Sequence, residues 1–358
     1  MGRRPTLAVV GATGAVGSVM CELLSSRKDV WGEIRLTASA ASCGRLLSVR
    51  GEELEVQALT PEFFDGVDVA MFDVPAEVAV EWAPIAATRG AVVVDNSGAF
   101  RMDRDVPLVV PEINAEQARN RPRGIIANAN CTTLTIVVML APLHREYGLR
   151  ELVLASYQAV SGSGQSGVDV LHDQISKVAG DRALGTRSGN VRQSVGDDLG
   201  PFPAPMALNV VPWAGSLMDL GWSSEELKVR SETRKILGLP DLKVSATCVH
   251  VPVVTGHSVA VHAVFASEVD AEGAREALRN APGVILVDDP ASGEYPMPID
   301  AVGTDPAWVG RIRRAMDDPR ALDLFVTGDN LRKGSALNTT QIAELLAKEF
   351  TPPSSSAR

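Results

Sequence analysis

One cysteine of this chain lies in a setting that suits a nucleophile. Cys131 follows Asn128-Ala-Asn130 and precedes Thr132-Thr133, between an apolar run at 124–127, which predicts a strand, and a long predicted helix at 132–147. A thiol beside a helix N-terminus has a lowered pKa, because the helix dipole favours the thiolate, which is the nucleophilic form. A small buried hydrophobe is the commonest alternative, and it fits the cysteines in a predicted helix, loop and strand: Cys21, Cys43 and Cys248. The polar neighbours of Cys131 favour attack on an acyl or aldehyde carbon.

A thiolate nucleophile needs a group that manages protons, and the chain has five histidines. His144 and His172 fall on predicted helices, and His262 falls on an alternating strand, where a structural role fits. His257 lies in Thr255-Gly256-His257-Ser258, which we predict to be a loop between two strands. Loops of this kind often present catalytic groups. His257 is therefore the candidate acid–base residue, with a structural role as the alternative.

Three spaced glycines predict a nucleotide site. Gly11, Gly14 and Gly17 follow a predicted strand at 6–10 and open a predicted helix at 18–24. Glycines allow the tight turn, and the backbone N–H groups at the helix start can hold a pyrophosphate. The alternative is a plain strand-to-helix turn. The context of strand, turn and helix favours dinucleotide binding.

The end of the second predicted strand bears on which dinucleotide is bound. An Asp or Glu there accepts hydrogen bonds from the ribose hydroxyl of NAD, but residues 37–42 contain no acidic residue. They contain no basic residue either, and the nearest cation is Arg45. A 2′-phosphate would be tolerated, so we favour NADP and keep NAD open.

The overall composition excludes several classes of protein. The formal charge of -10, from 44 acidic and 34 basic residues, repels polyphosphate backbones and argues against nucleic acid as a partner. Four dispersed cysteines suit neither a disulfide framework nor a metal site, so we expect no metal and a reducing, cytoplasmic compartment. Glycines interrupt the apolar run near the start, which argues against a signal peptide. The longest apolar stretch, 134–143, is about half of a bilayer span, so we expect no membrane segment.

The pattern along the chain predicts an α/β protein with two domains. Apolar runs at 34–38, 67–72 and 91–94 alternate with helix-forming segments such as 76–88, which predicts an open parallel sheet. Beyond Cys131 the pattern changes to strands at 152–159 and 243–254, a surface excursion at 180–205, a capped helix at 223–237 and a last helix at 334–350, followed by a disordered tail. We expect a dinucleotide-binding domain at 1–132 with 332–358, and a substrate-binding and dimerisation domain at 133–331. At 358 residues the chain is long enough for both.

The chain resembles the aspartate-semialdehyde dehydrogenase family along nearly its whole length. The resemblance rests on motifs that occur in order: GATGAVG at 11–17, VVVDNSGAFR at 92–101, DVPLVVPEIN at 105–114, GIIANANCTT at 124–133, SYQAVSGSG at 156–164, EELKVRSETRKI at 225–236, VPVVTGHS at 251–258, VGRIRR at 309–314 and DNLRKGSALNTTQIAE at 329–344. So many ordered motifs exclude a chance similarity.

The resemblance implies a Rossmann-type domain whose last helix returns from the C-terminus, and an α+β substrate and dimerisation domain with a mixed sheet. It implies a homodimer that interconverts L-4-aspartyl phosphate and L-aspartate 4-semialdehyde with NADP(H) through a Cys131 thioester, in aspartate-family amino-acid biosynthesis. Carried over by position, it makes Cys131 the nucleophile, His257 the acid–base residue and Gln158 a residue that orients the intermediate. It assigns Arg101, Asn130 and Lys228 to phosphate, Glu225 to the substrate amine, His250 to the substrate carboxylate, and Gly11, Thr13, Gly14, Ala15, Val16, Ser39, Ser42 and Asn330 to the cofactor.

Three ligand contacts depart from the family pattern. His250 stands where the family has an arginine that grips the substrate carboxylate, and one imidazole cannot replace a bidentate guanidinium. Ala41 replaces an arginine beside the 2′-phosphate, and Asp73-Val74-Pro75 replaces a Ser-Ala-Gly turn, which adds a carboxylate near the phosphates. These departures keep open a paralogue with another acyl phosphate or cofactor, or a catalytically quiet regulator. Glu225 speaks against substrates with a blocked amine.

Overall fold

The computed structural model describes residues 3–27 and 29–350. Within this range the chain forms two compact units, one made of the chain up to Asn130 together with the segment from Ser335, the other of Cys131–Gly334. The predicted Pro- and Ser-rich tail lies outside the described residues. None of the described helices combines the length and apolar content that a bilayer span requires.

The first unit is built on a seven-stranded sheet in the order β3-β4-β2-β1-β5-β6-β7. The strands are β1 Leu7–Val10, β2 Ile34–Thr37, β3 Leu46–Val49, β4 Glu52–Gln57, β5 Val69–Phe72, β6 Val92–Asp95 and β7 Ile125–Ala127. All neighbouring pairs are parallel except the β3–β4 hairpin. The predicted open parallel sheet is confirmed, and the antiparallel edge hairpin is an addition. The strand order reverses at β1, and open α/β sheets bind their ligands at the carboxyl ends of the strands at such a point.

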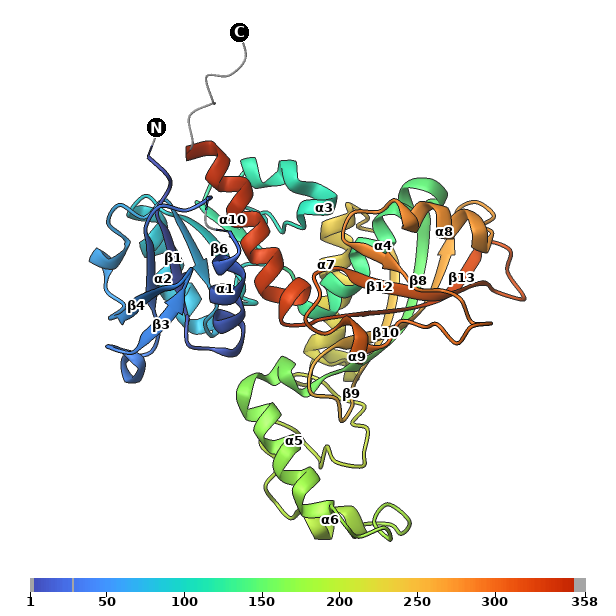
Figure 1. Ribbon diagram of the computed structural model, residues 1–358. Coiled ribbons are helices and arrows are strands. Elements are labelled where there is room, and N and C mark those ends of the chain that lie inside the picture. The colour runs from blue at the N-terminus through green and yellow to red at the C-terminus, as the bar shows by residue number, and fades with distance from the viewer. Residues whose placement is uncertain (1–2, 28, 351–358) are drawn as a thin grey trace. The chain divides into compact units, whose positions relative to one another are not determined.

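Helices cover both faces of this sheet (Figure 1). The helix α10 Leu337–Phe350 packs on β5 and β6 and against α1 Ala15–Ser25, while α2 Ala76–Thr88 also packs on β5, β6 and β7. All four residues of β5 are buried, as expected for a strand covered on both faces. Shorter turns complete the unit: Ala40–Ser42, Pro61–Phe64, α3 Pro111–Asn114 and Ala115–Arg119. The expected return of the C-terminal helix to the dinucleotide-binding fold is confirmed.

The second unit contains a six-stranded mixed sheet in the order β11-β12-β13-β10-β8-β9. Its strands are β8 Leu149–Gln158, β9 Lys243–His250, β10 His257–Phe265, β11 Val284–Leu286, β12 Ala307–Arg314 and β13 Ala321–Gly328. The long helix α4 Cys131–Tyr147 packs on β8, β10, β12 and β13, with α7 Ser224–Leu237 and α8 Ala271–Arg279 on either side of it. The predicted mixed sheet and the long helix after Cys131 are confirmed. A capping box of Ser223 and Glu226 starts α7, as the sequence predicted.

A helical arm extends from this sheet in Figure 1. It contains α5 Gly164–Val178 and α6 Asn190–Val195. The excursion predicted at 180–205 therefore contains a helix that the sequence did not predict, and a small core of Val178, Val195 and Ala207 supports it. The remaining short elements are Val160–Ser163, Asp219–Gly221, α9 Pro298–Ala301 and a π-helical turn at Arg332–Ala336.

Two sequence expectations at the strand ends are wrong. His257 is the first residue of β10, not a loop residue, because its backbone pairs with Gly328 of β13. The strand predicted at 243–254 ends at His250. Pro252 has no N–H group to continue the ladder, which explains the early end.

Candidate active site

The predicted nucleophile and the predicted acid–base residue lie together in the second unit. Cys131 is the first residue of α4, and His257 begins β10, on which α4 packs. The sulfur of Cys131 lies 3.3 Å from Nε2 of His257, although the residues are 126 positions apart. The cysteine is partly exposed, whereas only 2% of His257 is accessible. This distance is within hydrogen-bonding range for sulfur, so the imidazole directly contacts the candidate nucleophile.

The hydrogen bonds of His257 define where its proton lies. The backbone N–H of Ala159 donates to Nδ1 over 3.1 Å, so Nδ1 acts as an acceptor and carries no proton. A neutral imidazole must then carry its proton on Nε2, which faces the sulfur. Burial lowers the pKa of His257 to about 4, with an opposing effect of Glu225 and a reinforcing effect of His250. Near neutral pH the ring is therefore a neutral donor, and it favours the thiolate of Cys131 as its acceptor.

The backbone before His257 is held by Asn330. The side-chain oxygen of Asn330 accepts the Gly256 amide over 2.8 Å, and its nitrogen donates to Ser161 over 2.9 Å. Gly256 has a φ of 100°, and a Cβ there would lie 2.8 Å from Pro298, so no other residue fits. Asn330 is 2% exposed. In the structure it positions the strand that carries His257, and its predicted contact with the cofactor stays a prediction.

Further predicted residues gather near the carboxyl ends of β8 and β9. The amide nitrogen of Gln158 donates to Oε1 of Glu225 over 3.2 Å and also to the hydroxyl of Thr132. Glu225 lies in the first turn of α7, and its Oε2 is 3.6 Å from Nζ of Lys228. The cluster joins β8, α4 and α7 beside Cys131, with Gln158 only 2% exposed. The Glu225 carboxylate of this cluster can bind a ligand's ammonium group, and the Lys228 ammonium group can bind an anion.

His250 ends β9 beside Gln158, its partner in the parallel register. Its Nδ1 lies 2.9 Å from the carbonyl oxygen of Trp213. A carbonyl only accepts, so Nδ1 carries a proton, and the neutral ring presents Nε2 as an acceptor. The ring meets Phe202 edge-on, with the centroids 5.2 Å apart. These contacts fix the orientation of the imidazole, and its predicted contact with the substrate carboxylate stays a prediction.

In the first unit, Arg101 and Asn130 are 8% and 7% exposed. One guanidinium nitrogen of Arg101 donates to the carbonyl oxygen of Asn96 over 2.8 Å. Burial raises the pKa of Asp95, while Ser97 and Arg101 lower it. Asn130 immediately precedes Cys131 in the chain. The phosphate-binding roles of Arg101 and Asn130 stay predictions.

The glycine turn has the sterics that a dinucleotide cradle requires. A Cβ on Gly11 would overlap the carbonyl oxygen of Asp73, and a Cβ on Gly17 would overlap the carbonyl oxygen of Gly11. Gly14 is the N-cap of α1 and provides no side-chain cap. The first amides of a helix, here those of Ala15 and Val16, have no acceptor within the helix. The turn therefore fits a pyrophosphate bound to these amides.

The other predicted cofactor residues cluster at the carboxyl ends of β1 and β2. The hydroxyl groups of Thr13 and Ser42 lie 3.2 Å apart. The amide of Ser42 donates to the carbonyl of Ser39 over 2.8 Å, and the amide of exposed Arg45 donates to Ser42 over 3.2 Å. The structure brings the two serines and Arg45 into one turn, whereas Ala41 there offers no charge.

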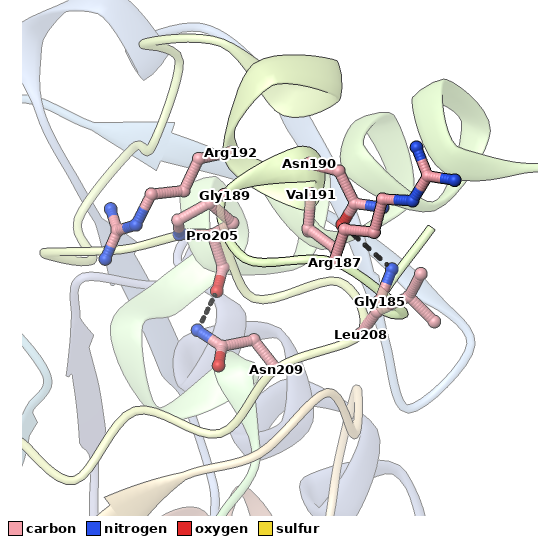
Figure 2. A pocket seen from close by; sticks show the side chains of 9 residues that line it. All are labelled: Gly185, Arg187, Gly189, Asn190, Val191, Arg192, Pro205, Leu208 and Asn209. Carbon is pink, nitrogen blue, oxygen red and sulfur yellow. Dashed lines mark hydrogen bonds between the residues drawn. The ribbon is translucent and has the colours of Figure 1, made fainter. Parts of the chain in front are cut away.

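Figure 2 shows a different pocket, between the arm and the segment that follows it. Asn190 accepts the Gly185 amide over 3.1 Å, and Asn209 donates to Pro205 over 2.8 Å. The guanidinium groups of Arg187 and Arg192, which line the pocket, point away from each other. None of the predicted site residues lines this pocket.

Two groups of the site were not predicted. The Ala159 amide sets the tautomer of His257, and a backbone amide gives no signal in residue type. The Thr132 hydroxyl binds Gln158, and its position directly after Cys131 was the only available signal.

Two family models match this chain. Residues 6–121 match the semialdehyde dehydrogenase NAD binding domain, and residues 140–333 match the semialdehyde dehydrogenase dimerisation domain. An aspartate-semialdehyde dehydrogenase of Corynebacterium melassecola is 48% identical over 350 residues, which cover 96% of this chain and 99% of that protein. The Bacillus subtilis enzyme of the same name is 42% identical over 97% of this chain and 99% of its own.

Solved structures resemble the whole chain as well. Aspartate semialdehyde dehydrogenase II from Vibrio cholerae, complexed with ASA, has a TM-score of 0.89 and 37% identity, covering 98% of this chain and 100% of that one. The enzyme from Candida albicans with NADP has a TM-score of 0.73 and 27% identity, covering 97% and 100%. By sequence and by fold, the chain belongs to the aspartate-semialdehyde dehydrogenase family.

Proposed function

We propose that this protein interconverts L-4-aspartyl phosphate and L-aspartate 4-semialdehyde with NADP(H) through a thioester on Cys131. The observation that carries the proposal is the 3.3 Å contact between Sγ of Cys131 and Nε2 of His257. The family relatives support the substrate, since 48% identity extends over 96% of the chain. The other substrates and the quiet regulator that the sequence left open find no support in these relatives.

The chemistry follows from the groups of the second unit. The Cys131 thiolate attacks the acyl carbon, the C–O bond to phosphate breaks, and phosphate leaves with the bonding electrons. When bound, the cofactor would supply the hydride for the thioester carbon, and cleavage of the C–S bond then releases the aldehyde and returns the Cys131 thiolate. The Nε2–H of His257 is directed at the sulfur, beside which the oxyanion of the tetrahedral intermediate develops. It stabilises the thiolate before attack and the oxyanion after it.

Binding groups surround this centre in the proposal. Glu225 accepts the substrate ammonium, and Lys228, 3.6 Å from it, takes the phosphate. Gln158, held between Thr132 and Glu225, orients the acyl group. The resemblance assigns Arg101, Asn130 and His250 to the remaining phosphate and carboxylate contacts.

The test measures oxidation of aspartate semialdehyde in the presence of phosphate, through the absorbance of the reduced nicotinamide. Wild type is expected to turn over, and Cys131→Ala is expected to lose kcat to background while remaining folded by circular dichroism. Cys21→Ala, which removes a thiol from α1, is the matched control and should keep its rate. A wild type that is inactive with both NAD and NADP would contradict the proposal.

NADP is the proposed cofactor. The end of β2 carries no acidic residue to accept a ribose hydroxyl, and Ser39, Ser42 and Arg45 share one turn there. We expect a higher kcat/KM with NADP than with NAD. Arg45→Ala should reduce the ratio of these two kcat/KM values. Equal ratios in both proteins would refute the role of Arg45.

A homodimer in the cytoplasm completes the proposal. The second unit matches a dimerisation domain. Its helices α4, α7 and α8 pack together beside the sheet, whereas Val153 and Tyr157 of β8 are 42% and 41% exposed. All four cysteines are free thiols, which suits a reducing compartment. Light scattering after gel filtration should give twice the chain mass, and a monomer would contradict the dimer.

A further inference from the structure

The carboxylate of Asp73 lies at the start of α1, where the proposed function places the cofactor pyrophosphate. Asp73 follows β5, next to β1 in the sheet. Its Oδ1 accepts the side-chain amide of Asn96 over 2.8 Å, and the backbone N–H of Gly17 hydrogen-bonds to the carboxylate. A Cβ on Gly14 would lie 3.6 Å from Oδ2. A negative group of the protein itself therefore occupies the positive end of this helix dipole.

The surroundings of Asp73 contain little to balance its charge. Within the described residues Asp73 forms no ion pair. The start of α1 has no charged side chain in its first turn. On β6 the nearest titratable group is Asp95, which repels Asp73 and is itself countered by Arg101. From the α10 side the contact is the Ser335 hydroxyl, which accepts from Asn96 over 2.7 Å.

Burial affects the pKa of Asp73 more strongly than the hydrogen bonds of its carboxylate do. It raises the pKa of Asp73 above 3.8, while the bonds from Asn96 and Gly17 lower it. The neutral carboxylic acid is therefore more accessible at this position than at an exposed aspartate. A pyrophosphate bound to the same turn would add negative charge beside the carboxylate and would raise its pKa further.

We propose that the dinucleotide binds this turn together with one proton, which is taken up by the Asp73 carboxylate. The inference rests on the proposed nicotinamide-dependent function and concerns its affinity for the cofactor. The direction of the pH dependence follows from the linkage between proton binding and dinucleotide binding. Below the pKa of the free protein Asp73 is already protonated, and the dissociation constant does not depend on pH. Between that pKa and the higher pKa of the complex, the dissociation constant rises about tenfold per pH unit.

Isothermal titration calorimetry tests the proposal without relying on catalysis. NADPH is titrated into the full-length protein between about pH 5.5 and 8, in pairs of buffers that differ in ionisation enthalpy, so that the protons taken up are counted. NADH is titrated in parallel, because it lacks the 2′-phosphate, which itself titrates in this range. Wild type is expected to take up a proton with both ligands and to bind more weakly as the pH rises.

Asp73→Asn removes the charge and keeps an oxygen that can accept from Asn96. We expect it to bind NADPH at least about tenfold more tightly than wild type at pH 8 and to lose the proton uptake seen with NADH. Asp29→Asn, at a 95% exposed side chain of the same unit, is the charge control and should behave like wild type. Wild-type binding without proton uptake overturns the inference alone, even if Asp73→Asn fails to fold. Absence of dinucleotide binding at every pH overturns the inference and the proposed function together.

Discussion

The protonation state of His257 predicts how the stability of this protein depends on pH. Burial lowers the pKa of His257 from 6.5 to about 4. The unfolded chain therefore binds a proton at this imidazole below pH 6.5, whereas the folded protein binds it only near pH 4. The stability linked to His257 is fully present above pH 6.5 and is lost as the pH falls towards 4. At about 1.4 kcal/mol per pKa unit, the full loss is about 3 kcal/mol.

The experiment compares wild type with His257→Asn, whose side-chain oxygen can still accept the Ala159 amide. Urea unfolding is followed by circular dichroism between about pH 4.5 and 7.5. The stability advantage of wild type over the variant should shrink by about 1.4 kcal/mol per pH unit on acidification. The buried carboxylates Asp73 and Asp95 titrate in both proteins, so their effect cancels in the difference. A difference that stays constant within about 0.5 kcal/mol over this range would refute the buried neutral imidazole.

Two further predictions concern the nucleophile and the glycine turn. A thiol-alkylating reagent near neutral pH should modify Cys131 at least about a hundredfold faster than Cys21 or Cys248. The reason is that burial raises the pKa of Cys21 to about 11 and of Cys248 to about 12. Peptide mass spectrometry gives the rate for each residue, and equal slow rates at all three would disprove an activated thiol. Gly17→Ala should weaken NADPH binding in calorimetry by at least about tenfold, because its Cβ overlaps a backbone carbonyl oxygen. Gly14→Ala has more room, since its Cβ would lie 3.4 Å or more from other atoms, so the reasoning fails if it weakens binding as much.

Local features of this protein could be predicted because neighbouring residues determine them. The run of apolar residues before Gly11 and the spacing of the glycines specify a strand and a tight turn, whatever the rest of the chain does. The capping box at Ser223 follows in the same way from short-range hydrogen bonding. Residue type and position were therefore enough to predict a candidate nucleophile and a candidate nucleotide-binding turn.

Contacts between distant segments of the chain decided the partners and the orientation of the His257 and His250 side chains. His257 meets Cys131 only because β10 pairs with β8 and β13 beneath α4, and that register also directs the Ala159 amide at Nδ1. His250 is oriented by the Trp213 carbonyl, 37 positions away in the chain.

At the glycine turn, too, the sequence determined one part and the tertiary structure another. The sequence determined that Asp73 adds a carboxylate to the cofactor region, since that depends on residue type alone. Only the tertiary structure decided that the carboxylate lies at the start of α1, bound to Gly17 and Asn96. The pairing of β1 with β5 brings it there, and its burial there is set by packing that no short-range pattern contains. Sequence thus determined which chemical groups are present, and the packing of distant strands and helices decided their distances, protonation and partners.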